Sequence, residues 1–342
     1  MKIKSPLTNK REVMALCEAG ANELFCGIEP YDWRKRFKGL PVNQRATGSN
    51  FTSLSDLEKA IYIAHQYKAK VHIAVNAFFY LEEQYRIAQA LIKDVLGLGA
   101  DGIIFADPVM LSAVDRNLLK DKDIIAGCDT VIFNSSAVNF YKKLGATRIV
   151  LPRSMTIGEI EELTAFQPAL EYEVFIIHDL CFFEDGLCAF CKEGSGELKK
   201  EGRAGDKISF YSAMRMPLRG YGGGCRTIFS RQRVSLLRAR YLKAERKFSF
   251  WEKRHIEGCG ACAIYAFKKI GIASLKVLDR NMPIQERVKA TAFIKEASGF
   301  LDNGDIPQAS YLEKFRVLFK RTFKSNCNYR DCYYPLWKER CI

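Results

Sequence analysis

Twelve cysteines are the residues of this 342-residue chain most suited to chemistry. Cys181 and Cys188 are separated by six residues, Cys225 follows three glycines, and Cys259 lies between two glycines. Sulfur is a soft ligand, and iron–sulfur clusters take four thiolates from segments that bend around a bulky group. The glycines favour such bending. We therefore expect these four cysteines to bind a metal ion or an iron–sulfur cluster.

Other cysteines lie outside this set. The pairs Cys188 with Cys191 and Cys259 with Cys262 have metal-ligand spacing but stand too far apart for a compact zinc ribbon. A second metal site is one interpretation of the remaining cysteines, and free thiols or a redox pair are the alternative. The candidate ligands of that second site are Cys262, Cys327, Cys332 and Cys341.

The sequence predicts a cytosolic protein without a membrane segment. It begins with the polar residues Met-Lys-Ile-Lys-Ser-Pro, and no stretch of about 18 apolar residues lacks a charge. Because thiols stay reduced in the cytosol, we expect metal ligation in place of disulfides.

Positive charge is concentrated in one stretch of the chain. The formal net charge is +14, and residues 199–254 hold 16 lysines and arginines against four acidic residues. Such a segment attracts polyanions, of which RNA is the obvious one. A solvated basic face is the alternative interpretation.

Short β-branched runs alternate with amphipathic stretches of about 10 to 15 residues, as expected of repeated βα units. Eight strands with helical connections predict a TIM-type (β/α)8 barrel, although an open doubly wound sheet has the same alternation. The predicted strands are Lys2–Ser5, Glu23–Gly27, Lys70–Val75, Gly102–Ala106, Ile124–Gly127, Arg148–Pro152, Tyr172–Ile177 and Ser274–Leu278.

The chain divides into four predicted parts. Residues 1–180 hold strands one to seven, and 181–273 form a long cysteine-rich, basic insertion between strands seven and eight that carries the cluster ligands. Residues 274–300 supply strand eight and a closing helix, and 301–342 form a helical C-terminal extension with a cysteine-containing tail.

The residues that follow the predicted strands are candidates for catalysis, because the active face of such a barrel is the one at the strands' carboxyl ends. They are Asn76, Asp107, Arg153, His178 and Arg280. His178 has a side chain suited to acid–base chemistry, and Arg153 with Arg280 could hold a small carboxylate ligand in bidentate fashion. Loop capping, or a structural hydrogen bond near the cluster for His178, is the alternative.

One segment resembles a known family. The run Glu173-Val-Phe-Ile-Ile-His-Asp-Leu-Cys181, followed by Cys188, is similar to the signature of the collagenase-like peptidases of unassigned catalytic type, peptidase family U32. The run Ser274-Leu-Lys-Val-Leu-Asp-Arg280 resembles a second motif of that family, whose lysine stands 17 residues after the last family cysteine. Counting back 17 residues from Lys276 leads to Cys259.

The resemblance implies a TIM-type barrel with a [4Fe-4S] cluster on Cys181, Cys188, Cys225 and Cys259. It also implies an enzyme similar to the relatives that hydroxylate tRNA, ribosomal RNA or a ubiquinone precursor without molecular oxygen, with prephenate as a suggested oxygen donor in some.

A peptidase of the same family and an RNA-binding protein with a structural cluster are the alternative functions. A hydrolase needs an activated nucleophile or a metal-bound water, and the chain contains neither Gly-x-Ser-x-Gly nor His-Glu-x-x-His. The basic segment 199–254 is the basis for RNA binding or RNA modification: its cations could bind phosphates, and Tyr211, Tyr221 and Trp251 offer faces for base stacking.

Overall fold

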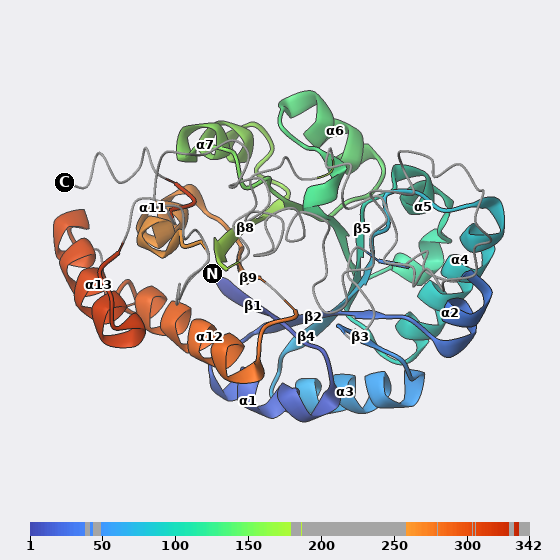
Figure 1. Cartoon of the computed structure of the whole chain (residues 1–342). Helices are drawn as coiled ribbons and strands as arrows, with labels where there is room; N and C mark the ends of the chain where they lie inside the picture. Colours follow the sequence, from blue (N-terminus) through green and yellow to red (C-terminus); the bar gives the residue numbers. More distant parts are fainter. Residues whose placement is uncertain are drawn as a thin grey trace, which may run out of the picture.

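The strands of the computed structural model form one closed barrel (Figure 1). The described residues are 1–37, 42–43, 49–178, 186, 258–278, 280–302, 304, 306–327 and 332–334. The strands are β1 (Lys2–Pro6), β2 (Glu23–Ile28), β3 (Asn50–Phe51), β4 (Lys70–Val75), β5 (Gly102–Phe105), β6 (Asp123–Ala126), β7 (Arg148–Val150), β8 (Glu171–Ile177) and β9 (Ser274–Val277).

Parallel pairing closes the sheet. It runs from β1 through β9, β8, β7, β6, β5 and β4 to β2, and β1 pairs directly with β2, with Lys4 opposite Glu23. An open doubly wound sheet has two unpaired edge strands, so its first and last strands do not pair with each other. The predicted TIM-type barrel is therefore confirmed.

All eight predicted strands are present, and each begins within one residue of its predicted start. Strand β3 was not among the predicted strands; it pairs with the carboxyl end of β2, where Gly27 stands opposite Asn50. Two residues are too few to produce an alternating pattern, so this strand has no signal in the sequence.

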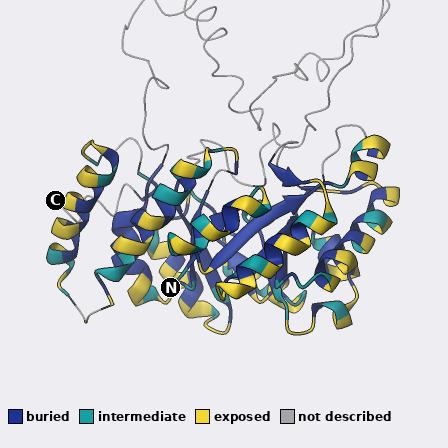
Figure 2. Ribbon diagram, turned by 90° about the horizontal axis from the view of Figure 1, so that it is seen from below, coloured by how far each residue is buried: buried dark blue, intermediate teal, exposed yellow. Residues whose placement is uncertain are grey.

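Helices surround the barrel and present their exposed faces outward (Figure 2). In α3 the side chain of Ser53 caps the first turn, and in α7 Thr156 and Glu159 form a capping box. The described α-helices are α1 (Val13–Glu18), α2 (Tyr31–Phe37), α3 (Leu54–Gln66), α4 (Glu82–Gly97), α5 (Pro108–Ala113), α6 (Ser135–Lys143), α7 (Ile157–Phe166), α11 (Ile264–Ile270), α12 (Ile284–Gly299) and α13 (Gln308–Phe323).

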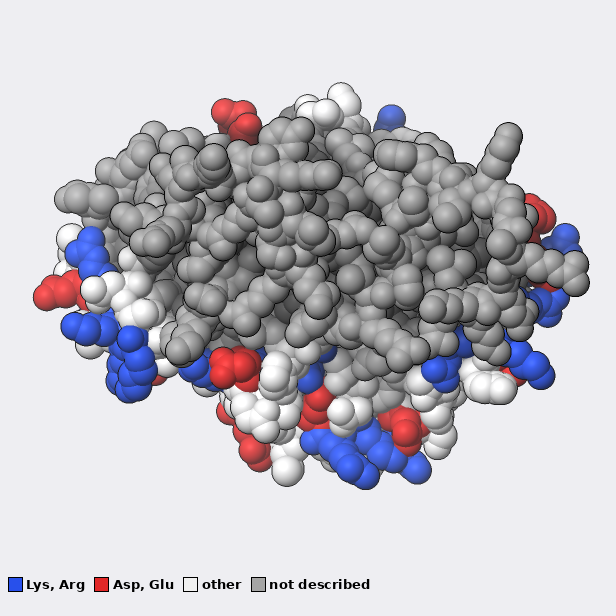
Figure 3. Space-filling view, in the orientation of Figure 1, with Lys and Arg blue, Asp and Glu red and all other residues white. Residues whose placement is uncertain are grey.

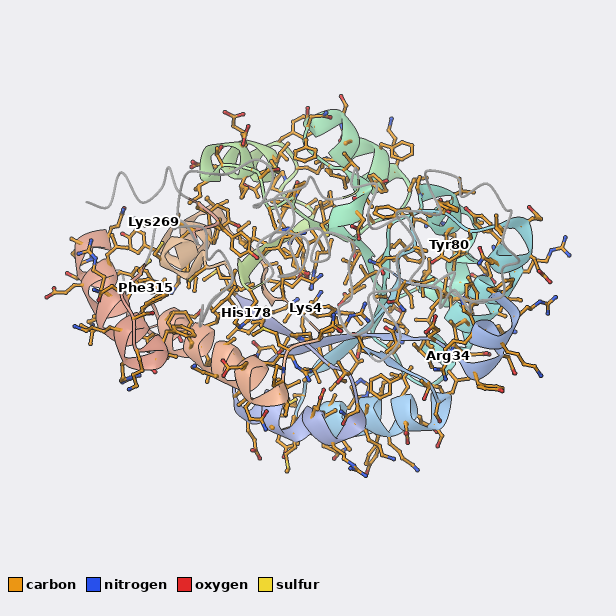
Figure 4. All side chains as sticks on the ribbon, in the orientation of Figure 1. Lys4, Arg34, Tyr80, His178, Lys269 and Phe315 are labelled. Atoms are coloured by element: carbon orange, nitrogen blue, oxygen red, sulfur yellow. The ribbon has the colours of Figure 1, made fainter. Side chains whose placement is uncertain are left out.

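A network of charged side chains lies inside the barrel, on the strands. Arg148 donates to both carboxylate oxygens of Glu23, at 2.6 and 2.8 Å, and to Glu173 at 3.2 Å. Lys276 pairs with the other oxygen of Glu173 at 3.0 Å, and Lys4 bonds Glu173 as well. Figure 4 places Lys4 within the ring of strands. The network joins five strands, β1, β2, β7, β8 and β9, because its members lie on them. Four of these side chains are almost fully buried, namely those of Lys4, Glu23, Arg148 and Glu173.

The balance of charges sets the protonation of this network. Burial by itself raises the pKa of Glu173, but the charges of Lys276, Lys4 and Arg148 outweigh it and hold that pKa well below its ordinary value. Glu173 is therefore ionised, and three cations share its negative charge.

The predicted insertion 181–273 lies outside the described residues except for Gly186 and residues 258–273. The division into parts stays a prediction. On the described surface in Figure 3, lysine and arginine side chains lie at the rim, mixed with acidic ones. None of the helices in the described ranges is long and apolar enough to cross a lipid bilayer.

Candidate functional site

His178 immediately follows β8 and has an unusual backbone conformation. Its φ is +68°, in the left-handed region that non-glycine residues rarely occupy. Its backbone N–H donates to the carbonyl of Gly258 at 2.9 Å, and its carbonyl accepts from the hydroxyl of Tyr333. The strand end is thus fixed between two segments that are distant in sequence, which offsets the cost of the strained backbone. The His178 side chain is buried.

Arg280 lies in a cradle beyond the end of β9. It donates to the side-chain oxygens of Asn50 at 2.8 Å and of Asn43 at 3.0 Å, and it is 4% exposed. A Cβ atom on Gly27 would lie 2.5 Å from the guanidinium and 2.3 Å from the Asn50 oxygen. Glycine at position 27 is therefore what lets the guanidinium approach β2.

We expect Gly27→Ala to destabilise the protein by about 1–3 kcal/mol, because a buried arginine and two asparagines would have to move. Urea unfolding measures this. Gly97→Ala is the matched control: it lies in α4, its Cβ would meet nothing within 4 Å, and alanine is the better helix former. Equal stability of the Gly27→Ala and Gly97→Ala variants would contradict the claim that the close approach of Arg280 and Asn50 requires glycine at position 27.

Two cationic side chains contact one aromatic ring on β8. The guanidinium of Arg153 lies 5.2 Å from the centre of the Phe175 ring, and the ammonium of Lys276 lies 5.7 Å from it. Lys276 also lies 4.6 Å from the Phe25 ring. Ring faces attract cations and position them. Arg153 and Lys276 are therefore positioned on one ring, and together with Arg280 they are candidate partners for a carboxylate or phosphate ligand.

Asp107 and Asn76 have structural partners. Asp107 caps α5 by accepting from the N–H of Val109 at 2.8 Å, and it accepts from the Tyr85 hydroxyl. Burial, then the bond and charge of Asp107, raise the pKa of Tyr85. Asn76 donates to Asp129 at 3.1 Å. These contacts agree with the capping interpretation of Asp107, and a catalytic role for either residue stays a prediction.

One of the four cysteines implied as cluster ligands is described. Cys259 is buried and forms an isolated antiparallel bridge with Ile177, the residue before His178. Cys181, Cys188 and Cys225 lie outside the described residues, as does Cys341 of the predicted second site. The other candidates for that site, Cys262, Cys327 and Cys332, are described.

Several members of this site were not among the candidates predicted from the sequence. Asn43 and Asn50 hold Arg280, while Phe175 and Glu173 hold Lys276. Lys276 and Glu173 stood within the two family motifs, so a signal existed for them. Asn43 and Asn50 follow no strand pattern, and only the folded chain brings them to Arg280.

A family model described as peptidase family U32 matches residues 8–334. The chain belongs to peptidase family U32. The match extends from before α1 to the segment that contacts His178, so it includes all described residues of the candidate site.

Among curated relatives, this U32 protein is 29% identical to tRNA hydroxylation protein P2 of Bacillus subtilis over 177 residues, 52% of each chain. It is 26% identical to tRNA hydroxylation protein P of Haemophilus influenzae over 190 residues, 55% of this chain and 38% of the relative. With the 23S rRNA 5-hydroxycytidine C2501 synthase of Escherichia coli it shares 27% identity over 164 residues, 48% of this chain and 24% of the relative. The aligned regions thus span about half, or less, of these relatives.

Proposed function

We propose that this U32 protein is an oxygen-independent hydroxylase that acts on RNA. The observation that carries the proposal is the match to relatives named for tRNA and rRNA hydroxylation, combined with a family model that spans nearly the whole chain. The cationic side chains of Arg153, Lys276 and Arg280 support it, because an anionic co-substrate needs such partners.

In this proposal the residues of the barrel bind and orient the oxygen donor. Arg280 is held rigidly by two asparagines, so it can offer a fixed fork to a carboxylate without losing side-chain freedom on binding. Lys276 is fixed by Glu173 and by two rings. A small dicarboxylate such as prephenate has the charge that these groups would recognise.

The proposed cofactor is a [4Fe-4S] cluster on Cys181, Cys188 and Cys225, with a fourth ligand that the resemblance assigns to Cys259. Thiolates are the donors that such clusters require. Cys259 is buried next to the end of β8, which is a suitable position for an anchor close to His178. When bound, the cluster would supply one-electron redox chemistry. His178 is proposed to hold or move a proton at its imidazole.

The proposed substrate contact is the basic segment 199–254, which lies outside the described residues. In the sequence this segment lies between Cys188 and Cys259. Ligation of those two cysteines by the proposed cluster would therefore tether its positive charge near the end of β8. A cytosolic location is part of the same proposal.

We expect replacement of Arg231, Arg233, Arg238 and Arg240 by glutamine to weaken binding of bulk tRNA by about tenfold or more. The slope of log affinity against log salt should flatten by up to about 3, because the variant would lose up to four phosphate contacts and so release fewer counterions on binding. Filter binding or fluorescence anisotropy at several salt concentrations measures both.

The matched control removes the same charge from exposed positions around the barrel. Lys35, Lys59, Lys93 and Lys120 are exposed, and their replacement by glutamine should change the salt slope little. Iron content should be intact in both variants. If both variants bind tRNA as the wild type does, or if the wild type binds none at low salt, the basic segment is not an RNA contact.

A further inference from the structure

The exposed face of α13 is strongly basic. It carries one acidic side chain, Glu313, and five exposed cations on the helix or at its carboxyl cap, namely Lys314, Arg316, Lys320, Arg321 and Lys324. By contrast, α7 exposes three glutamates and no lysine or arginine. Lysine and arginine side chains gather at the left of Figure 3, where Figure 1 places α13. The outer helices therefore differ in charge, and α13 is the basic one among these two.

The helix dipole explains only part of this charge. Cations in the last turn of a helix are stabilised by the partial negative charge at its carboxyl end. Lys320 and Arg321 lie in that turn, and Arg321 also pairs with Glu296 on α12. Lys314 and Arg316 lie in earlier turns, where the dipole offers no such stabilisation. Their charge calls for a different reason.

Lys324 places a cation where the backbone favours glycine. Its φ is +54°, and its N–H closes the helix by donating to the carbonyl of Lys320 at 2.9 Å. Glycine adopts this left-handed conformation without strain and is the usual residue at such a helix end. A strained residue at an exposed position points to a use for its side chain.

The opposite face of α13 is apolar and already covered. The rings of Phe315, Phe319 and Phe323 lie 5.8, 6.0 and 4.9 Å from the Phe293 ring of α12, measured between ring centres. A helix that lies on a membrane buries its apolar face in lipid. Here that face packs on the protein, and Val317 is the one large apolar side chain that α13 exposes. The basic face thus fits a polyanion in water better than a lipid surface.

α13 is fastened beside the candidate site at two points. On its buried face, the Tyr311 hydroxyl donates to the carbonyl of Ala261 at 3.0 Å, two residues after Cys259. After the helix, the tail reaches the end of β8, where the Tyr333 hydroxyl donates to the carbonyl of His178. A polyanion held on α13 would therefore lie next to the segments that form the candidate site.

We propose that the exposed face of α13 binds the phosphate backbone of the RNA substrate, an inference that rests on the proposed function. Lys314 and Lys324 are ten residues apart, which is about 15 Å along an α-helix, so several phosphates of one strand can lie along this face. Each neutralised phosphate releases counterions, and this release favours binding. Such contacts hold and orient the RNA without reading its sequence.

The test removes four of these charges from the full chain. The α13 variant combines Lys314→Gln, Arg316→Gln, Lys320→Gln and Lys324→Gln, and it leaves the Arg321–Glu296 pair in place. Its dissociation constant for bulk tRNA should rise about tenfold or more, and the slope of log affinity against log salt should flatten by up to about 3. Fluorescence anisotropy of labelled tRNA at several salt concentrations measures both.

The control is the variant with glutamine at positions 35, 59, 93 and 120, which also loses four exposed charges. It should bind tRNA nearly as the wild type does. Both variants should keep the wild-type urea midpoint, because the exchanged side chains are exposed. An α13 variant that binds tRNA as tightly as the control variant would overturn the proposal.

Lys324→Gly separates charge from stability. Glycine relieves the strained backbone, so the urea midpoint should rise, while the loss of one phosphate contact should weaken tRNA binding by about threefold. Weaker binding by a more stable protein would exclude misfolding as the cause. Wild-type affinity in Lys324→Gly would remove this lysine from the proposed contact.

Two further measurements separate the alternatives. If wild-type protein binds tRNA through α13 but adds no oxygen to RNA nucleosides, the proposed function is wrong and the α13 contact stands. If hydroxylation occurs and the α13 variant equals the wild type in tRNA affinity, the contact is wrong and the function stands. Binding to phosphatidylserine vesicles that the α13 variant loses, with unchanged tRNA affinity, would assign the face to a membrane and overturn the proposal.

Discussion

Glu173→Gln is expected to destabilise the protein by about 3–5 kcal/mol, the largest stability effect anticipated for any single exchange in the barrel. Three buried cations, Lys4, Arg148 and Lys276, contact this one carboxylate. Glutamine keeps the shape of the side chain and removes the charge, so the cations lose the partner that offset their desolvation. Chemical unfolding in urea measures the difference in free energy.

The control is Glu82→Gln on α4. Its carboxylate is 88% exposed and lies 3.9 Å from Arg86. Such a surface pair contributes little, so the change should stay within about 0.5 kcal/mol. Similar unfolding free energies for the Glu173→Gln and Glu82→Gln variants would show that the buried network does not stabilise the barrel.

The same network predicts a dependence of stability on acid. The pKa of Glu173 is lower in the folded protein than in the unfolded chain, so the folded state binds its proton less readily. Its stabilising contribution is then complete above the unfolded pKa, near 4, and is lost as the pH falls further. Glu173→Gln should therefore reduce the acid sensitivity of unfolding below about pH 4.

Arg280→Gln is expected to lower RNA hydroxylation by about tenfold to hundredfold, which is the value of one or two hydrogen bonds from a charged donor to a carboxylate. The variant leaves Asn43 and Asn50 in place but removes the guanidinium. Arg280→Lys should recover only part of the activity, because an ammonium cannot form a bidentate fork. Mass spectrometry of nucleosides from digested RNA gives the activity.

Two measurements keep this prediction specific. Iron content of Arg280→Gln should stay near that of the wild type and the variant should still be folded at the assay temperature, as measured by circular dichroism, if the arginine acts on the oxygen donor. A higher concentration of the donor should partly restore turnover if binding is what is lost. Full activity in Arg280→Gln would contradict a role for this residue in the reaction.

Much of the fold was predictable because its signals are local. Strands such as Lys70–Val75 are short apolar runs. The helices predicted within 274–300 and 301–342 correspond to α12 and α13, each of which follows a proline, Pro283 or Pro307, and has apolar residues at helical spacing. The positions of Arg153, His178 and Arg280 next to strand ends follow from the same pattern.

The long-range contacts were not predictable from the sequence. Glu173 and its partners Lys4 and Arg148 appear as isolated charges inside strands, and only the closed barrel brings them together. The bridge between Cys259 and Cys332 likewise depends on where the tail returns to the barrel. Charges and thiols separated by long stretches of chain have no periodicity that would indicate their contact.

The most direct test of the account is the nucleoside content of RNA in cells that lack their own RNA hydroxylases and express this chain. We predict that tRNA or rRNA from these cells will contain a pyrimidine nucleoside heavier by one oxygen atom, that it will form without molecular oxygen, and that Cys188→Ser will abolish it. RNA without any added oxygen, from cells in which the protein is folded and carries its iron, would contradict the proposed function.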